Sequence, residues 1–569
     1  MKPISSNMFK LTAISAMILS TTSASAALYQ VIEVEPQTTF AFESVYGVAI
    51  QPGNVANDNP LGCFADGTTD CESSFKLAGE TRLVATHAGQ AIDGLSYREE
   101  APFGIDNGFI YVQDDARDFE RYCRSELRYA ICETWADIRW KVWKKEINGD
   151  QTPNAIAFVE GQATPIDETK NVVVNSLTAN AEPIGITLTP GDVTGSRRNS
   201  VKAIGIVDIT TEPESNWPQT RAWKTDGTYT VGSVARKATN NEGNFYTSKG
   251  AIWDSSGRMT EIPWPSNNAN HNNRLAQGSL RDVMVKDGNI YAVGYNTFYS
   301  DQNLMQASVS ILKIEGDDTL SFTNTKPVAE ATVRENGNSG DRRIYSNSLL
   351  TAVNKHGIAI GEAKLSRAES GAYANRLFVV PDINDPKANF LNGSLFFAGA
   401  GGKAGAINNF NEIVGQIDTE ETREAGGKPR RKRGFIYPYG TEQQGSVPER
   451  QAIFNNRAWL LDDLTNGGQF SGDNNQYRII AATDINDAGV IAATALKCTG
   501  GYDSTAHNAQ CGAGKGQEKT VAVKLVPIAG KNHEDISPRG TDELVVERNG
   551  AGLGLWSLIL GGLLWFRRK

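Results

Sequence analysis

The sequence predicts an all-β chain in the form of a β-propeller-like ring of about six to eight blades, with a helical insertion and a C-terminal transmembrane helix. Three observations predict this fold class. A short Asn/Gly hairpin motif recurs along the chain, an aromatic strand recurs between its copies, and the copies are far enough apart to hold about four strands each. We expect the propeller-like domain to occupy residues 27–545.

The hairpin motif is seen most clearly in three stretches, each with a β-branched residue, Asn, two variable positions, Gly or Asn, and then an alternating apolar strand. They are "VNKHGIAIG" from Val353, "INNFNEIVG" from Ile407 and "INDAGVIAA" from Ile485, with looser copies from Thr239 and Val285 and a further candidate from Ile105. Asn and Gly tolerate positive φ and close tight turns between paired strands. We therefore interpret the repeated asparagines as structural groups that bond the turn backbone rather than as ligand-binding groups; these are Asn240, Asn354, Asn408 and Asn486.

An aromatic strand followed by a turn recurs between the hairpins. Its copies are "RAWKTDG" from Arg221, "GAIWDSSG" from Gly250, "NRLFVVPD" from Asn375, "RGFIYPYG" from Arg433 and "RAWLLDD" from Arg457. Counted from Gly243, the hairpin positions Gly288, Gly357, Asn411 and Gly489 follow at intervals of 45, 69, 54 and 78 residues. A motif that persists at irregular spacing favours a propeller over an array of β-sandwiches.

A helical insertion is expected over residues 116–146, because apolar residues between Phe119 and Val142 recur at helical spacing. Cys123 and Cys132 both lie in this stretch, and nine residues of continuous helix would separate them by about 13 Å, beyond disulfide reach. Either the helix breaks between them or they pair with Cys63 and Cys71. Six cysteines in an exported chain suggest disulfides, and we expect a bridge between Cys498 and Cys511 around a Gly- and Asn-rich loop.

Both ends of the chain predict export. Lys2 and Lys10 precede a short apolar run, and Ala24-Ser25-Ala26 suits a signal peptidase, so residues 1–26 are expected to be a signal peptide. At the other end, residues 549–569 hold an uncharged apolar run from Ala551 to Phe566, which spans about 24 Å as a helix. A cationic end follows, formed by Arg567, Arg568 and Lys569. Cations beside an apolar segment mark its cytoplasmic side, so the bulk of the chain is expected outside the cytoplasm.

The glycine-rich start, apolar middle and basic end of this tail resemble the GlyGly-CTERM sorting tail of Gram-negative envelope proteins. The resemblance implies cleavage by a rhomboid-type protease near Gly550, Ala551 and Gly552, followed by surface display or release. Between Arg221 and Ala493, the paired aromatic strands and hairpins resemble HAF-type extracellular repeats. The whole chain thus looks like an uncharacterised family of exported Gram-negative proteins, which implies a propeller-like fold and brings no catalytic residue.

Composition and motifs narrow the function without identifying a ligand. A net charge of −9 with interspersed signs argues against nucleic acid as a partner. The five histidines show no metal-binding spacing and no nucleophile elbow is present, so we assign no catalytic, metal or cofactor-binding residue. Two oxygen-rich segments, Pro381 to Asn389 and Asp484 to Asp487, lack calcium-loop spacing and are expected to form turns.

We interpret one dense basic run, Arg430 to Arg433, as a solvated hairpin tip. The more specific hypothesis is that this run contacts an anionic envelope polymer. Repeats without catalytic motifs favour a binding or interaction protein for an envelope polysaccharide or protein over an enzyme. The alternative is an extracellular hydrolase that acts on a polymer, with an acidic site in the propeller channel. A purely structural envelope component is a third possibility, and it predicts no ligand pocket.

Overall fold

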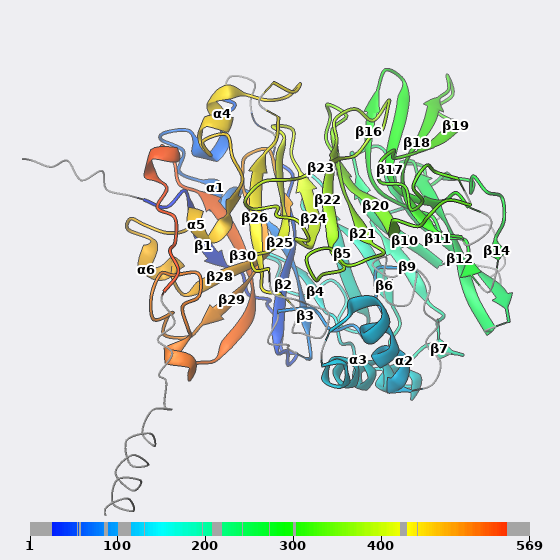
Figure 1. The fold of residues 1–569 in the computed structure, drawn as a ribbon, viewed down its shortest axis with the longest axis horizontal. Helices are drawn as coiled ribbons and strands as arrows, with labels where there is room; N and C mark the ends of the chain where they lie inside the picture. Colours follow the sequence, from blue (N-terminus) through cyan, green and yellow to red (C-terminus); the bar gives the residue numbers. More distant parts are fainter. Residues whose placement is uncertain are drawn as a thin grey trace, which may run out of the picture.

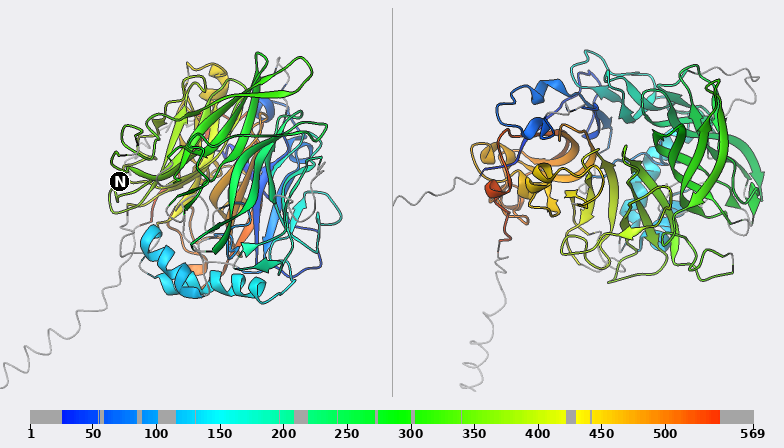
Figure 2. Two further views of the ribbon diagram at one scale, coloured as in Figure 1. Left: turned by 90° about the vertical axis from the view of Figure 1, so that its right-hand side faces the viewer. Right: turned by 90° about the horizontal axis from the view of Figure 1, so that it is seen from above.

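Seven small antiparallel sheets stand in a ring around a central axis (Figures 1 and 2). The computed structural model describes residues 26–542 except 54, 56–58, 85–88, 101–114, 130, 196, 208–218, 242, 272–273, 300–302, 339, 422–429 and 441. Within this described part, the first strand of each sheet lies innermost and contacts the first strand of the next sheet around the whole ring. The chain is thus a seven-bladed β-propeller, which confirms the all-β propeller prediction.

The blades follow one another in chain order, each starting with its innermost strand. Blade 1 is β2 (Ser44–Ile50), β3 (Leu77–Arg82) and β4 (Ala157–Val159), and blade 2 is β5 (Asn171–Leu177), β6 (Pro183–Leu188) and β9 (Val201–Ile204). Blade 3 is β10 (Gln219–Thr225), β11 (Thr230–Asn240), β12 (Gly243–Trp253) and β13 (Met259–Glu261), and blade 4 is β16 (Ser279–Lys286), β17 (Asn289–Thr297), β18 (Met305–Ile314) and β19 (Leu320–Pro327).

The last three blades contain the clearest sequence repeats. Blade 5 is β20 (Tyr345–Val353), β21 (Ala359–Leu365), β22 (Asn375–Val380) and β23 (Asn389–Phe390), and blade 6 is β24 (Gly402–Ile407), β25 (Glu412–Asp418), β26 (Lys432–Pro438) and β27 (Trp459–Leu460). Blade 7 is β28 (Tyr477–Ile485), β29 (Ile491–Cys498), β30 (Glu518–Pro527) and, from the other end of the chain, β1 (Tyr29–Glu33).

The ring is closed by the pairing of β1 with β30, which brings Tyr29 opposite Pro527. The first described strand thus becomes the outermost strand of the last blade. The pairing covers the edge of β30 that blade 7 would otherwise expose, and covering edges is one way in which β-sheet proteins protect them. It also means that the ends of the propeller domain hold each other in place.

The apolar core is divided into layers between neighbouring sheets. One cluster joins Val414 and Ile436 of blade 6 to Ile479 and Val523 of blade 7, and similar clusters lie between blades 4 and 5, 5 and 6, 7 and 1, 3 and 4, and 1 and 2. A single blade cannot bury both of its faces alone. The repeated units are stable because each covers its neighbours.

The propeller has two distinct faces. The turns between the first and second strands of the blades lie on one end, here called the hairpin face. The connections between the second and third strands lie on the opposite end, here called the insert face. The described residues between β3 and β4 belong to the insert face and contain α2 (Ala116–Tyr122) and α3 (Cys132–Ile147), seen below the blades in Figure 1 and in the left view of Figure 2.

The helical insertion is not one continuous helix. After α2 the chain makes a π turn, η2 (Cys123–Leu127), and Arg128 takes a left-handed conformation with φ 61°. This break brings the α-carbons of Cys123 and Cys132 to 5.6 Å, and the two cysteines form a disulfide. Of the two pairings that the sequence left open, the helix break is therefore the one that occurs. Cys63 pairs with Cys71 and Cys498 with Cys511.

Short helices and two-residue strands lie in the connections between the blade strands. These are η1 (Gly62–Phe64), α1 (Cys71–Ser74), β7 (Val193–Thr194), β8 (Arg197–Arg198), β14 (Asn270–His271), β15 (Arg274–Leu275), α4 (Pro448–Ala452), α5 (Leu461–Leu464), α6 (Ser471–Asn474), η4 (Gly512–Gly514) and η5 (His533–Asp535).

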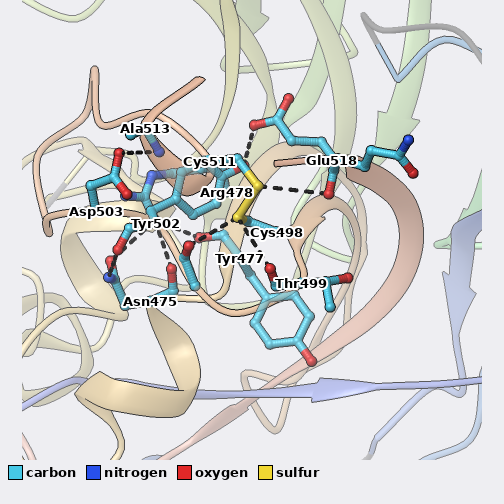
Figure 3. Close-up of a disulfide and its surroundings, with 12 residues drawn as sticks. Asn475, Tyr477, Arg478, Cys498, Thr499, Tyr502, Asp503, Cys511, Ala513 and Glu518 are labelled. Carbon is cyan, nitrogen blue, oxygen red and sulfur yellow. Dashed lines mark hydrogen bonds between the residues drawn. A yellow bond between two sulfur atoms is a disulfide. The ribbon is translucent and has the colours of Figure 1, made fainter. Parts of the chain in front are cut away.

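The disulfide of blade 7 fixes the long connection between β29 and β30 on the insert face (Figure 3). Inside that loop the Tyr502 hydroxyl donates to Glu518 Oε1 at 2.5 Å, and the Arg478 guanidinium lies 3.9 Å from the Tyr502 ring centre. The loop around Cys498 and Cys511 is thus packed and hydrogen-bonded as well as covalently closed.

The hairpin at Asn240 joins the second and third strands of blade 3, so it lies on the opposite face from the other repeats. The interval of 45 residues from Gly243 to Gly288 therefore separates two different kinds of turn. No helix in the described part of the chain is long and apolar enough to cross a membrane. The expected signal peptide up to Ala26 and the tail at 549–569 lie outside the described residues, apart from Ala26 itself, as does the repeat candidate from Ile105.

Candidate functional site

Every innermost strand carries a β-bulge, which distorts the backbone around the axis. The register shifts fall between Gly47 and Ala49, Val174 and Ser176, Ala222 and Lys224, Leu280 and Asp282, Leu350 and Ala352, Ala404 and Ala406, and Ala482 and Asp484. Bulges redirect side chains and strengthen the local twist. The residues at and after the bulges therefore determine what lies at the centre of the ring.

On the insert-face side, the centre is occupied by side chains of the insertion itself. Glu99 accepts a hydrogen bond from Arg281 Nη2 at 2.5 Å, and Glu100 accepts from the Tyr295 hydroxyl at 2.8 Å and from Ser233 Oγ. Burial raises the pKa of Glu99, although the Arg281 charge opposes the rise. These contacts join the segment before α2 to blades 3 and 4 through one ion pair and two hydroxyl hydrogen bonds.

The same segment is anchored to blades 1 and 2. Arg98 donates to Asn175 Oδ1 at 2.8 Å and also bonds Glu80. Arg198 bonds both carboxylate oxygens of Glu146 at 2.8 Å and the backbone carbonyls of residues 93, 95 and 96. The insertion is thus fixed across the insert face rather than attached at one point.

Further along the axis, Lys224 reaches across the ring to Asp484, with Nζ 3.7 Å from Oδ1. Asp282, also near Lys224, accepts the backbone N–H of Val353 in the next blade at 3.0 Å. Asp484 of blade 7 likewise accepts the backbone N–H of Ile50 in blade 1 at 3.1 Å. Burial raises the pKa of Asp282 to about 6, while Lys224 opposes the rise. The two carboxylates bond neighbouring blades together and face one shared cation.

Three of the four repeated asparagines, Asn354, Asn408 and Asn486, form a chain of hydrogen bonds on the hairpin face, here called the asparagine relay. Asn354 Nδ2 donates to the backbone carbonyl of Asn408, Asn408 Nδ2 donates to that of Asn486, and Asn486 Nδ2 donates to that of Gln51, each at 3.1 Å. Their Oδ1 atoms accept backbone N–H groups within their own turns. Each asparagine therefore closes its hairpin and bonds the next blade.

This relay also positions a pocket. Asn354 Nδ2 donates to Asn411 Oδ1 at 2.8 Å, and Asn411 Nδ2 donates to the Gln444 carbonyl at 3.1 Å. The loop of residues 440–446 is thereby held against His356, so closely that a Cβ at Gly445 would lie 2.3 Å from the His356 ring. Repeat residues of blades 5 and 6 thus fix one wall of the pocket.

The pocket lies on the hairpin face over blades 4, 5 and 6 and has a volume of about 230 Å³. We call it the hairpin-face pocket. Its lining residues are Met284, Lys286, Tyr291, His356, Gly357, Ile358, Pro381, Asp382, Ile383, Asn384, Gln443 and Gln444. They combine one aromatic ring with several polar side chains from separate loops, the usual composition of a small-ligand site.

The polar groups of the pocket are partly preorganised. Asn384 donates to Asp382 Oδ1 through its backbone N–H at 2.9 Å and its Nδ2 at 2.8 Å, which fixes both side chains in one turn. His356 Nε2 lies 3.2 Å from the Asn409 carbonyl. Burial and the nearby Lys355 charge lower the pKa of His356. The lowered pKa favours the neutral form of the ring.

Two other hollows are less suited to ligand binding. One of about 670 Å³ beside β1 and β4 contains Glu33 and Glu160, whose carboxylates are already paired with Lys497 and Lys524. The other, of about 240 Å³ beside blades 5 and 6, is lined mainly by apolar and small residues such as Leu377 and Phe396. No group of three or more metal-ligating side chains occurs in the described ranges.

The basic run from Arg430 to Arg433 is not a solvated tip throughout. Arg430 is 3% exposed and bonds the carbonyls of Gly399 and Ser370, and Arg433 is 8% exposed and lies 3.0 Å from Asp462. Only Arg431 and Lys432 reach solvent appreciably. Arg433 lies in β26 with its side chain turned inward, and Arg430, which precedes that strand, is held inside by its bonds to the Gly399 and Ser370 carbonyls.

The fold and the pocket define a seven-bladed β-propeller with a polar ligand-sized cavity on its hairpin face. The chain belongs to a family of proteins of unknown function, DUF3466, whose model matches residues 225–569. The match includes blades 4 to 7 and with them the asparagine relay and the pocket.

Among solved structures, the fold is weakly similar to several glycoside-hydrolase propellers. One is from the GH130 family of mannoside phosphorylases, described as targeting β-1,2 mannosidic linkages in Candida mannan (9% identity, 58% of this chain and 87% of that chain, TM-score 0.23). The α-L-arabinanase of Cellvibrio cellulosa is another (11% identity, 47% of this chain and 91% of that chain, TM-score 0.24). The GH32 β-fructofuranosidase of Bombyx mori is a third (11% identity, 40% of this chain and 51% of that chain, TM-score 0.20). The similarity is distant, and no residue role is transferred from it. No curated protein matches the sequence.

Proposed function

We propose that this chain is an exported binding protein, tethered to the cell envelope, whose hairpin-face pocket recognises a hydroxyl-rich polymer such as an envelope polysaccharide. The observation that carries the proposal is the pocket itself. Three blades contribute to it, and the asparagine relay holds its wall in place. A rigid, preformed site of this kind lowers the ordering cost of binding.

The chemistry of the lining suits hydroxyl groups. Each hydroxyl both donates and accepts, and Asn and Gln side chains offer a donor and an acceptor together. Asn384, Gln443 and Gln444 supply such pairs, and Asp382 supplies a carboxylate. The Tyr291 ring adds an apolar surface with a polar tip, which stacks on the less polar face of a ligand. A neutral, hydroxyl-rich ligand satisfies all of these groups.

Binding to purified envelope polysaccharide tests the proposal. We expect Asn384→Ala and Tyr291→Ala each to weaken binding by at least about tenfold, because one hydrogen-bonded amide or one ring stacked on the ligand contributes roughly 1.4 kcal/mol or more. Asn324→Ala is the matched control, since Asn324 is exposed on β19 away from the pocket. Equal binding by Asn384→Ala, Tyr291→Ala and the control would exclude this pocket as the site.

Export and tethering rest on the signal-like segment before Ala27 and on the tail with its basic end. The intact mass of the mature protein, measured in cells with and without the rhomboid-type protease, tests them. A mass ending between Gly550 and Gly552 that depends on the protease supports surface sorting. A full-length tail in both strains would contradict sorting and leave a plain anchor.

A second candidate function is hydrolysis by channel carboxylates, favoured by the raised pKa of Asp282, about 6, beside Asp484. A carboxyl group of such a pKa suits general acid catalysis near neutral pH. Polymer turnover by the purified protein that is lost in Asp282→Asn, while that variant remains folded, would favour the hydrolase. Binding without turnover, unchanged by that substitution, would favour the binding protein.

A further inference from the structure

We infer that the insert face is a membrane-contacting surface, applied to the phospholipid bilayer that the tail enters, so that the hairpin-face pocket points away from the membrane. This inference rests on the tethering in the proposed function. It is carried by the place where the described chain ends, by the length of chain that follows, and by the side chains exposed on that face.

The described chain ends on the insert face. Asp542 bonds Ser504 Oγ and exchanges two hydrogen bonds with Asn508, at 2.7 and 2.8 Å. Three residues earlier, Arg539 donates to the carbonyls of Asp462 and Thr505. Ser504, Thr505 and Asn508 belong to the connection between β29 and β30, which the Cys498–Cys511 disulfide closes (Figure 3). The C-terminal segment is therefore fixed to this face up to Asp542.

The chain that follows is short. Residues 543–548 separate Asp542 from the tail at 549–569, and six extended residues reach about 22 Å at most. A blade strand of nine residues, such as β28, is already about 30 Å long. The linker cannot pass around a blade to the hairpin face and still enter a bilayer there. The insert face must lie against or close to the membrane that holds the tail.

Exposed apolar side chains occur at two places on the same face. Phe40 and Phe42 are 37% and 38% exposed in the connection from β1 to β2, which lies on the insert face beside blade 7. Ile131 is 62% exposed at the start of α3. Aromatic and aliphatic side chains that project from a protein surface partition into the interfacial layer of a bilayer.

The charged side chains of the helical insertion are compatible with a membrane surface, but they contribute less to membrane contact than the apolar side chains do. Arg117, Arg124 and Lys141 are exposed, yet each is paired with a carboxylate of the insertion. Lys144 and Lys145 are exposed in the last turn of α3 and have no ion pair in the described part of the chain. Such lysines attract anionic headgroups weakly. The three apolar side chains are therefore the main contact, with lysines at its rim.

The test uses the full-length protein in proteoliposomes that contain a phospholipid with a photoactivatable acyl chain. After irradiation, vesicles are floated and lipid-bearing peptides are identified by mass spectrometry. Outside the tail, we expect adducts in peptides of residues 34–43 and 115–149 and none in the hairpin-face segments 354–358, 381–384 and 440–446. A combined Phe40→Ser, Phe42→Ser, Ile131→Ser variant should lose these adducts about tenfold while staying in the floated fraction.

A matched control replaces exposed apolar residues elsewhere, Val207→Ser and Phe322→Ser, and should leave the adduct pattern unchanged. Adducts in the tail alone, or equally on both faces, would overturn the inference while leaving the tethering intact. A protein absent from the floated vesicles would instead contradict the tethering in the proposed function. The two failures are thus separate results of one experiment.

Discussion

Gly361 lies so close to Leu349 that a Cβ on the glycine would be 2.3 Å from the leucine carbonyl oxygen. Gly361 is on the second strand of blade 5, opposite the residue before the bulge in the first strand. The same close approach, 1.8–2.5 Å to a first-strand carbonyl, occurs at Gly185, Gly232, Gly294 and Gly415. The glycine that ends two of the three clear repeats thus lies where the bulge brings backbone against it, whereas Ala493 takes the matching position in blade 7.

We therefore predict that Gly361→Ala lowers the free energy of unfolding by about 2–3 kcal/mol, the usual cost of forcing extra volume into a packed site. Denaturant unfolding measures it. Gly316→Ala is the control, since a Cβ there meets nothing within 4 Å. Equal stability of the two variants would show that the bulge relaxes without cost and that the repeated glycine has another cause.

The asparagine relay predicts a second effect on stability. Asn408 is 4% exposed, donates to Glu412 Oε2 at 2.6 Å and to the Asn486 carbonyl at 3.1 Å, and accepts two backbone N–H groups. Asn408→Ala leaves these buried partners unpaired, so we expect a loss of about 3 kcal/mol. Asn324→Ala, at an exposed position, should change stability by less than about 0.5 kcal/mol. Similar values for both would contradict a role of the relay in joining blades.

The disulfide between Cys123 and Cys132 should stabilise the insertion locally. Replacing both cysteines by serine removes a constraint worth roughly 2–3 kcal/mol for a loop of this length. We expect faster amide hydrogen exchange in residues 115–149 and little change in blades 4 to 7, because the insertion has its own apolar cluster around Phe119 and Trp143. A uniform rise in exchange over all blades would mean that the insertion and the ring unfold together.

Asp282 predicts a pH dependence of stability. Its folded pKa, about 6, lies above its usual value of 3.8, because burial disfavours the carboxylate. The folded state therefore binds the proton more tightly, and the free energy of unfolding falls as pH rises from about 4 to about 6, by on the order of 3 kcal/mol. Asp282→Asn removes this dependence, so unfolding measured between pH 4 and pH 7 should give a flatter curve than the parent protein. An unchanged slope would assign the dependence to other groups.

The sequence alone was sufficient to predict local turns. It was insufficient to predict which distant residues meet when the ring of blades closes. The hairpins at Asn354, Asn408 and Asn486 could be recognised because each turn is encoded by a few adjacent residues. The hairpin at Asn240 has the same local pattern, but it joins different strands of its blade. Local turn chemistry does not specify which pair of strands it connects.

The pocket and the channel depend on contacts between distant segments. Asp382 and Asn384 lie in a segment that was expected only to form a turn; it does, and blade packing then places it beside His356 and Gln443. Glu100 shows no motif at all, since its partners Ser233 and Tyr295 lie in two other blades. The oxygen-rich turns in the sequence could have indicated the pocket, because several of them lie on one face. Their position on one face can be recognised only when the order of the blades is known.

The most direct test of the account is a hydrogen-exchange comparison of the full-length protein with and without bound envelope polysaccharide. The account predicts protection in residues 354–358, 381–384 and 440–446 and none around Glu99 and Arg281 or in α2 and α3. Protection centred on the channel residues, or no protection at a saturating concentration of polysaccharide, would contradict the assignment of the hairpin-face pocket as the binding site.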